Sequence, residues 1–308
     1  MSMETQSCLK KVQDNIAQVI VGKETEVNLL LTAMLANGHV LIEDVPGVGK
    51  TTLIKSLARS WGADFRRVQF TPDVLPGDLT GISIFNSQKQ SFSFHAGPVM
   101  CNILLADEIN RASPKTQSAL LECMEERQVS VDGKTYPLPE PFFVMATQNP
   151  REFYGTFPLP ESQVDRFMFT FSLGYPTMAE ELDILDRFQL ESPLRDLSAI
   201  LPIETLPELQ AQVRHVHIDS SLRHYLVNII NALRHSPKIS LGVSPRGTIS
   251  LFKAAQAFAA LHGRTYVLPD DIKYLAIPTL RHRFRTADNL SPDNVIREVL
   301  DSLPIPLS

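Results

Sequence analysis

The turn EDVPGVGKTT, residues 43–52, has the residue types that a phosphate-binding loop needs. Its glycines let backbone N–H groups approach an anion closely, where side chains would collide. Lys50 would place a positive charge on the β- and γ-phosphates of a nucleotide, and the Thr51 hydroxyl would ligate Mg²⁺. The strict pattern G-x-x-x-x-G-K-[ST] asks for glycine at position 44, where this chain has aspartate. The turn is therefore either a phosphate loop or an ordinary Gly/Pro-rich bend, and the rest of the chain has to decide.

A second candidate for chemistry is NILLADEIN, residues 102–110, an apolar run that ends in two carboxylates. Asp107 would hold Mg²⁺ through water, and Glu108 would polarise an attacking water as a general base. Strands often end in acidic residues, so the pair alone is weak evidence. When it follows a phosphate loop in the same sheet, it becomes strong evidence for nucleoside triphosphate hydrolysis.

Three more polar residues stand at expected strand ends or helix starts. Asn149 could hydrogen-bond the attacking water or the γ-phosphate, or simply form an Asn-Pro turn. Arg166 could pair with Asp165 or Glu161 of its own subunit, or reach a neighbouring subunit's γ-phosphate as an arginine finger. Arg246 could sense the phosphate or merely stand at the start of a helix.

The hydrophobic pattern predicts an α/β fold that would position these residues. Continuous apolar runs predict parallel strands covered on both faces, at 39–43, 66–70, 101–107, 142–147 and 167–172. Helical spacing predicts helices at 24–36, 51–62 and 113–127. Alternating segments at 81–97 and 128–138 predict two hairpin insertions.

The character of the chain changes after residues 173–177, because the remainder is mostly helical in pattern. Helices are predicted at 178–190, 205–213, 219–235, 245–262 and 269–281. We therefore expect an α/β domain over residues 1–174 and a smaller helical domain over residues 175–308.

Composition narrows the class of protein. The chain has 308 residues, 44% hydrophobic and 20% charged, which is the profile of a soluble globular protein. A net charge of -5 argues against a strongly basic nucleic-acid surface. Three scattered cysteines make neither a disulfide framework nor a zinc cluster, and we expect a reducing cytoplasm. No stretch approaches the length of apolar sequence that a membrane span needs.

Taken in this order along the chain, the elements resemble the AAA+ ATPases and, within them, the MoxR family. The turn at 43–52 is therefore interpreted as a phosphate loop, and aspartate at position 44 is itself usual in this family. The resembling stretches span nearly the whole chain: EDVPGVGKTT, FTPDVLPGDLTG, GPVMCNILLADEINRASPKTQSALLECMEERQV, ATQNPREFYGTFPLPESQVDRF, SPRG and DDIKYLAIPTLRHRF.

The resemblance implies a set of ligand contacts and catalytic roles. ATP and Mg²⁺ are the implied ligands, with Thr51 and Asp107 on the metal. Asn149 is assigned as sensor 1, Arg166 as the finger that acts on the neighbouring site, and Arg246 as sensor 2. The residues expected to contact the nucleotide are Pro46, Gly47, Val48, Gly49, Lys50, Thr51, Thr52 and Asp107.

The resemblance also implies an architecture and a biological role. It implies a sheet in the order 5-1-4-3-2, an all-α lid, and a ring, expected to be hexameric, with each ATP site between two subunits. The hairpins at 81–97 and 128–138 correspond to the helix-2 insert and the pre-sensor-1 hairpin. Members of the family are chaperone-like ATPases that mature or activate protein complexes, often metalloenzymes, with a partner that carries a von Willebrand factor A domain.

Two other functions fit the same motifs. A motor of a related AAA+ clade could act on DNA or in a chelatase complex, although the acidic chain argues against nucleic acid as a partner. A nucleotide-gated scaffold would bind ATP and assemble but scarcely hydrolyse it. The Asp107–Glu108 pair argues against the scaffold.

Two polar features have an ordinary structural interpretation. His215 and His217 stand one residue apart without a third ligand near them, so a β-like alternation at the surface is favoured over a metal site. The basic run LRHRFR, residues 280–285, is interpreted as the cationic end of a lid helix, which the helix dipole favours, rather than a nucleic-acid contact.

The same holds for two groups of apolar residues. The aromatic residues of the first hairpin, at 85, 92 and 94, are assigned to the core, with a grip on substrate as the minor alternative. Cys101 and Cys123 are predicted to be small buried apolar residues.

Overall fold

The core of the protein is a parallel β-sheet. The computed structural model describes residues 3–88, 90–150, 155–189, 193–287 and 290–306. Within these residues the largest sheet has five strands in the order β2-β5-β8-β1-β9, all paired in parallel. Numbered along the chain and read from the β9 edge, this is the predicted order 5-1-4-3-2, which is therefore confirmed. The strands are β1 (Val40–Glu43), β2 (Phe65–Gln69), β5 (Ile103–Asp107), β8 (Phe143–Gln148) and β9 (Phe169–Phe171).

Apolar residues on both faces of the central strands explain why they lie inside the sheet. All five residues of β5 are buried, whereas the edge strand β2 is only partly covered. On one face, Ile103 and Leu105 belong to the core shared with α1, α2 and α3. On the other face, Leu104 and Ala106 belong to the core shared with α5. The helices are α1 (Met3–Ala17), α2 (Glu24–Leu35), α3 (Lys50–Ser60) and α5 (Pro114–Glu126).

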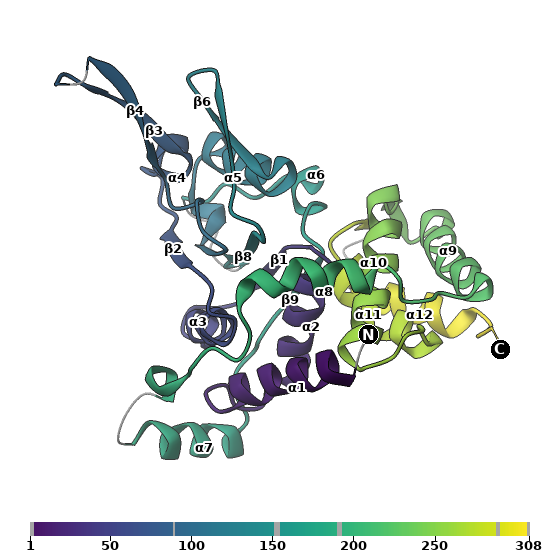
Figure 1. The fold of residues 1–308 in the computed structure, drawn as a ribbon. Helices are drawn as coiled ribbons and strands as arrows, with labels where there is room; N and C mark the ends of the chain where they lie inside the picture. Colours follow the sequence, from purple (N-terminus) through teal and green to yellow (C-terminus); the bar gives the residue numbers. More distant parts are fainter. Residues whose placement is uncertain (1–2, 89, 151–154, 190–192, 288–289, 307–308) are drawn as a thin grey trace.

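Both predicted hairpins are present, and Figure 1 shows them projecting from the same side of the molecule. The first is formed by β3 (Gly81–Asn86) and β4 (Ser91–Ala96) after the short helix α4 (Pro76–Thr80). The second is formed by β6 (Gln128–Val131) and β7 (Lys134–Pro137).

Two of the three aromatic residues of the first hairpin lie outside the predicted core, whereas Phe94 packs against it. Phe94 stacks on Tyr136 of the second hairpin, with ring centroids 4.0 Å apart. Phe85 and Phe92 are exposed and contact each other, so the core assignment is wrong for these two residues. The hairpin extends beyond the core, which explains why its apolar residues are left in solvent.

The C-terminal part is a helical lid, as predicted, with the helices gathered at the opposite end from the hairpins (Figure 1). A short antiparallel pair, β10 (Ile239–Leu241) with β11 (Arg285–Thr286), is added to it. His217 forms an isolated bridge with Tyr266, in line with the predicted β-like alternation. The lid and connecting helices are α7 (Met178–Phe188), α8 (Leu206–Val213), α9 (Ser220–His235), α10 (Pro245–Leu261), α11 (Pro269–Leu280) and α12 (Pro292–Ser302). The short helices η2 (Pro193–Asp196) and η3 (Ile203–Thr205) lie between α7 and α8. Two other short helices belong to the α/β part: η1 (Ile109–Arg111) after β5 and α6 (Glu161–Val164) before β9.

A buried ion pair joins the lid to the core. The Arg283 guanidinium, 6% exposed, donates to the Asp165 carboxylate at 2.5 Å, to the Phe167 carbonyl at 2.5 Å and to the Ser250 hydroxyl at 3.1 Å. Burial lowers the pKa of Arg283 to about 10, and Asp165 opposes the shift. A pair buried in this way is costly to break, so it fixes how the lid sits against the sheet. In the described part of the chain, no helix has both the length and the apolar character that crossing a membrane would require.

Candidate functional site

The turn between β1 and α3 has a backbone that only glycine adopts easily. Gly47 has φ 88° and Gly49 has φ 91°, and α3 begins at the next residue. A methyl group at either position would meet nothing within 4 Å, so conformation rather than crowding within this chain requires glycine here. The result is a loop that ends at a helix N-terminus, where backbone N–H groups are available to an anion.

Asp44, the departure from the strict loop pattern, fastens this turn to the chain that leaves the sheet. One carboxylate oxygen, Oδ2, accepts the backbone N–H groups of Leu173 at 2.7 Å and Gly174 at 2.8 Å. The other, Oδ1, accepts the N–H of Val45 at 2.8 Å. The aspartate therefore replaces a loop glycine by an anchor that orients the segment leading to α7.

The side chain of Lys50 folds back onto the loop at 44–49, which precedes it in the sequence. Its ammonium group donates to the carbonyl oxygens of Asp44 at 3.1 Å and Val45 at 3.0 Å. Burial lowers the pKa of Lys50 below its ordinary value. The carboxylates of Asp44, Asp107 and Glu108 oppose this shift. Strands β1 and β5, which lead into the loop and into the acidic pair, lie on either side of β8, so the candidate phosphate loop and the acidic strand end lie at the same edge of the sheet.

Asp107 is buried at the end of β5 and both of its carboxylate oxygens have partners. Arg67 of β2 donates to Oδ2 at 2.7 Å and 3.2 Å. Thr147 of β8 donates its hydroxyl to Oδ1 at 2.6 Å. A carboxylate held by two neighbouring strands keeps a fixed orientation, which suits an outer ligand of a metal that is bound through water.

Glu108 is held by its backbone and by two side chains. It has φ 58°, an uncommon conformation for a residue other than glycine, and its N–H donates to the Thr147 hydroxyl at 2.9 Å. Its carboxylate accepts from the Gln69 amide at 2.9 Å and from the Arg111 guanidinium at 3.1 Å. Strained backbone of this kind is typical of functional sites, where surrounding contacts hold it.

Asn149, Thr51 and Thr52 lie at the same edge of the sheet. Asn149 follows β8, the strand between β1 and β5, so three adjacent strands deliver the loop, Asn149 and the acidic pair. The backbone carbonyl of Asn149 accepts from the Asn110 amide at 3.4 Å. Thr51 and Thr52 are half-buried in the first turn of α3.

A cavity of about 420 Å³ adjoins the phosphate loop. Its walls are Val19–Val21 before α2, the loop residues Gly47–Gly49, and the inner face of α7 with Ile184 and Phe188. One end is polar backbone and the other end is apolar. This combination suits a nucleotide, with phosphates at the loop and the base against the apolar wall.

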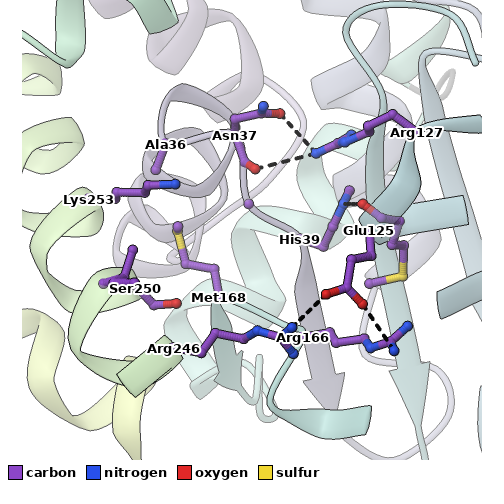
Figure 2. Close-up of a pocket in the computed structure, with 13 residues that line it drawn as sticks. Ala36, Asn37, His39, Glu125, Arg127, Arg166, Met168, Arg246, Ser250 and Lys253 are labelled. Carbon is purple, nitrogen blue, oxygen red and sulfur yellow. Dashed lines mark hydrogen bonds and ion pairs between the residues drawn. The ribbon is translucent and has the colours of Figure 1, made fainter. Parts of the chain in front are cut away.

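Arg166 and Arg246 do not join this cavity but line another, of about 570 Å³, between the sheet and α10 (Figure 2). Both arginines bind the Glu125 carboxylate at the end of α5, at 3.0 Å from Arg166 and 2.6 Å from Arg246. None of the described loop residues 44–52 lines this cavity. The two predicted arginines are brought together, but away from their own subunit's phosphate loop.

The two carboxylates suggested as partners of Arg166 within its own subunit, Asp165 and Glu161, do not bind it. Asp165 pairs with Arg283 and Glu161 pairs with Arg285 at 2.6 Å, so neither carboxylate takes Arg166. The three arginines of the basic run at 280–285 therefore each have a carboxylate partner, because Arg281 pairs with Asp293 at 3.2 Å. No cluster of three or more metal-binding side chains occurs among the described residues, His215 and His217 included.

Sequence reasoning missed the residues that hold the Asp107 and Glu108 carboxylates. Arg67 and Gln69 alternate along a predicted strand, so their polar side chains beside the strand that ends at Asp107 were a usable signal. Thr147 lies in a predicted strand as well. Glu125 gave no signal, because one acidic residue on the exposed face near the end of a helix is unremarkable.

Comparison with known proteins agrees with this geometry. Residues 39–169 match the family model described as "ATPase family associated with various cellular activities (AAA)", and residues 231–301 match the AAA lid domain. The chain is 51% identical to the uncharacterized protein YeaC of Bacillus subtilis, over 97% of this chain and 95% of that protein. It is 40% identical to the chaperone MoxR1 of Mycobacterium tuberculosis, over 97% of this chain and 82% of that protein. The solved structure of a "putative ATPase" from Cytophaga hutchinsonii has a TM-score of 0.92 and 38% identity, over 99% of this chain and 97% of that one.

Proposed function

The chain belongs to the MoxR family of AAA+ ATPases, and we propose that it hydrolyses ATP to remodel, mature or activate partner protein complexes. The observation that carries the ATPase proposal is that the loop after β1 and the acidic pair at the end of β5 lie at the same edge of the sheet, on either side of β8. We also propose that the ATPase core covers residues 1–174 and the lid residues 175–308.

The residues around the loop have separate roles in this proposal. Backbone N–H groups of residues 46–52 and the Lys50 ammonium bind the phosphates of ATP, which is the substrate. The Thr51 hydroxyl and the Asp107 carboxylate would hold Mg²⁺, and their oxygen donors fit that ion. When bound, Mg²⁺ neutralises charge that develops on the phosphates.

Hydrolysis needs a base and a group that orients the water. Glu108 takes the proton of the attacking water, and its contacts with Gln69 and Arg111 keep the carboxylate at the strand end. Asn149, on the neighbouring strand end, hydrogen-bonds the water or the γ-phosphate.

The transition state needs positive charge that the loop alone does not supply. Arg166 and Arg246 share one carboxylate in a cavity separate from the loop, so we propose that both act on the ATP of the next subunit. A site shared in this way fits a ring of head-to-tail subunits, which we propose to be hexameric. The client is then a protein complex, such as a metalloenzyme, and the adaptor a protein with a von Willebrand factor A domain.

ATP turnover tests the ATPase proposal. Lys50→Ala should abolish ATP binding, because it removes the charge on the phosphates, whereas Lys55→Ala in the same helix should bind normally. Glu108→Gln should bind ATP but turn it over at least about 100-fold more slowly, the scale of a lost general base. Glu126→Gln, an exposed glutamate of α5, is the matched control.

The outcomes separate the competing functions. A wild-type chain that binds ATP and assembles without measurable turnover would be a nucleotide-gated scaffold. Normal turnover by the Glu108→Gln variant would remove Glu108 as the base. If turnover behaves as proposed, Glu108→Gln becomes a trap that holds the client for identification by pull-down.

A further inference from the structure

Helix α7 has an apolar face that the rest of the chain leaves in solvent. Met178, Leu182 and Leu185 stand at helical positions i, i+4 and i+7, and they are 81%, 57% and 67% exposed. No residue of α7 is buried, and Figure 1 shows the helix at the edge of the molecule, apart from the lid. An exposed apolar stripe on an amphipathic helix is the usual mark of a contact surface. We call these three residues the outer face of α7.

The charge of α7 adds to this signal. The helix contains Glu180, Glu181, Asp183 and Asp186 but only one basic residue, Arg187, which pairs with Asp183 at 2.7 Å. The outer face is therefore an apolar stripe within an acidic helix. Its partner should offer apolar contact together with positive charge.

Such a surface exists beside α10 on the same chain. The cavity that holds Arg166 and Arg246 adjoins a second of about 490 Å³, and both are lined by Ala36, Asn37, Ile249 and Lys253. We call these shared residues, together with Phe252 and Arg214 of the second cavity, the α10 groove.

The α10 groove has the properties that α7 requires. Ile249 is 54% exposed in it. Lys253 and Arg214 make no ion pair with any residue in the described part of the chain, so their charges are available to a partner. An apolar floor beside the cations Lys253 and Arg214 complements an apolar stripe beside Asp186, for which the described residues supply no ion pair.

We expect the α10 groove to be filled by α7 of a second copy of this chain. This inference rests on the proposed function, in which Arg246 acts on the neighbour's ATP. Arg246, Ile249 and Lys253 stand at i, i+3 and i+7 of α10, so they lie on one face of the helix. When Arg246 meets the neighbour, the α10 groove meets it too, and α7 is a wall of that neighbour's nucleotide cavity.

We propose that the outer face of α7 docks in the α10 groove of the next subunit, which closes the nucleotide site between them. The contact is heterologous, because the two surfaces belong to different parts of the chain, and a heterologous contact forms a ring when the rotation between subunits closes. Since the inner face of α7 lines the nucleotide cavity, ATP supports the docked position of the helix and assembly becomes nucleotide-dependent.

Assembly of the full chain with a slowly hydrolysed ATP analogue tests this proposal by light scattering over a concentration series. Leu182→Lys and Leu185→Lys should each raise the concentration of half-assembly at least about ten-fold, because each loses apolar contact and brings an ammonium group to the cations of the groove. Phe92→Lys, at an exposed aromatic of the first hairpin, is the matched control and should assemble as the wild type does. Binding of a fluorescent ATP analogue by monomers checks that the variants are folded.

Charge reversal tests the identity of the occupant. Asp186→Lys and Lys253→Glu should each weaken assembly alone, and an equimolar mixture should recover it, because alternating subunits can pair a wild-type contact with a reversed one. Wild-type assembly by the Leu182→Lys and Leu185→Lys variants, or no recovery on mixing, would overturn the proposal. The ATPase proposal would survive either result, since it depends on wild-type turnover and on Glu108→Gln.

Discussion

Removing the Asp44 carboxylate should destabilise the protein, although the residue breaks the loop pattern. Its oxygens accept three backbone N–H groups, from Val45, Leu173 and Gly174, and two of these lie 129 and 130 residues away in sequence. Asp44 is 8% exposed and Leu173 is 5% exposed, so water reaches the Leu173 N–H poorly when the acceptor is removed.

The magnitude follows from the cost of stranded donors. A buried donor without a partner costs about 1–3 kcal/mol, and a donor that water can reach costs less. With one buried and two more accessible donors, Asp44→Ala should lower the free energy of unfolding by about 3 kcal/mol. Asp44→Asn keeps one oxygen for Leu173 and Gly174 but turns an amino group toward Val45, so it should cost about 1–2 kcal/mol.

Urea denaturation of the monomer measures these values, with Asp73→Ala as the control. Asp73 is exposed, and its loss should change the free energy of unfolding by no more than about 0.5 kcal/mol. If Asp44→Ala matched this control, the anchor role of Asp44 would be refuted.

Three further predictions concern two buried histidines, two buried cysteines and the exposed Glu125. Burial lowers the pKa of His39 and His282 well below the ordinary value, so only the unfolded chain takes up their protons. The free energy of unfolding should therefore have its full value above about pH 6.5. Below that pH it should fall by up to about 1.4 kcal/mol per pH unit per histidine, and it should fall less steeply in His39→Gln. Burial raises the pKa of Cys101 and Cys123 to about 12, so a thiol reagent at pH 8 should modify them only after unfolding, and modification of the native chain would contradict their burial. Glu125→Gln should lower turnover about ten-fold at unchanged ATP affinity, because two guanidinium groups lose the carboxylate that positions them; unchanged turnover would contradict this.

The sheet and the loop were predictable because local pattern determines them. Buried strands read as continuous apolar runs, and the glycines and Lys50 stand next to each other in sequence. The helices α1 and α12 were missed, although Leu9, Val12 and Ile16 have the spacing of a buried helix face. This spacing is a local pattern, so α1 was predictable from the sequence.

The partners of the site residues could not be predicted in the same way. Arg166 meets Glu125 and Arg246 only because α5, the segment before β9 and α10 converge in space. Sequence distance favoured the adjacent Asp165, but that carboxylate is bound by Arg283, more than a hundred residues later. Pairings of this kind depend on the packing of the lid against the sheet, which no local pattern encodes.

The central claim is that each ATP site is completed by the next subunit, and mixing two inactive variants tests it. Arg166→Ala should bind ATP almost normally but lose about 10³-fold in turnover, the scale of an arginine finger. Lys50→Ala should not bind ATP, yet it keeps an intact Arg166.

In an equimolar mixture, a working site reappears wherever a Lys50→Ala subunit lends its arginine to an Arg166→Ala neighbour with an intact loop. Random co-assembly places the two variants in that order at about a quarter of the junctions of a ring, so ATPase activity should recover to about a quarter of the wild-type value. No recovery in a mixture whose co-assembly is shown by cross-linking would contradict the shared site and leave Arg166 as a residue of its own subunit.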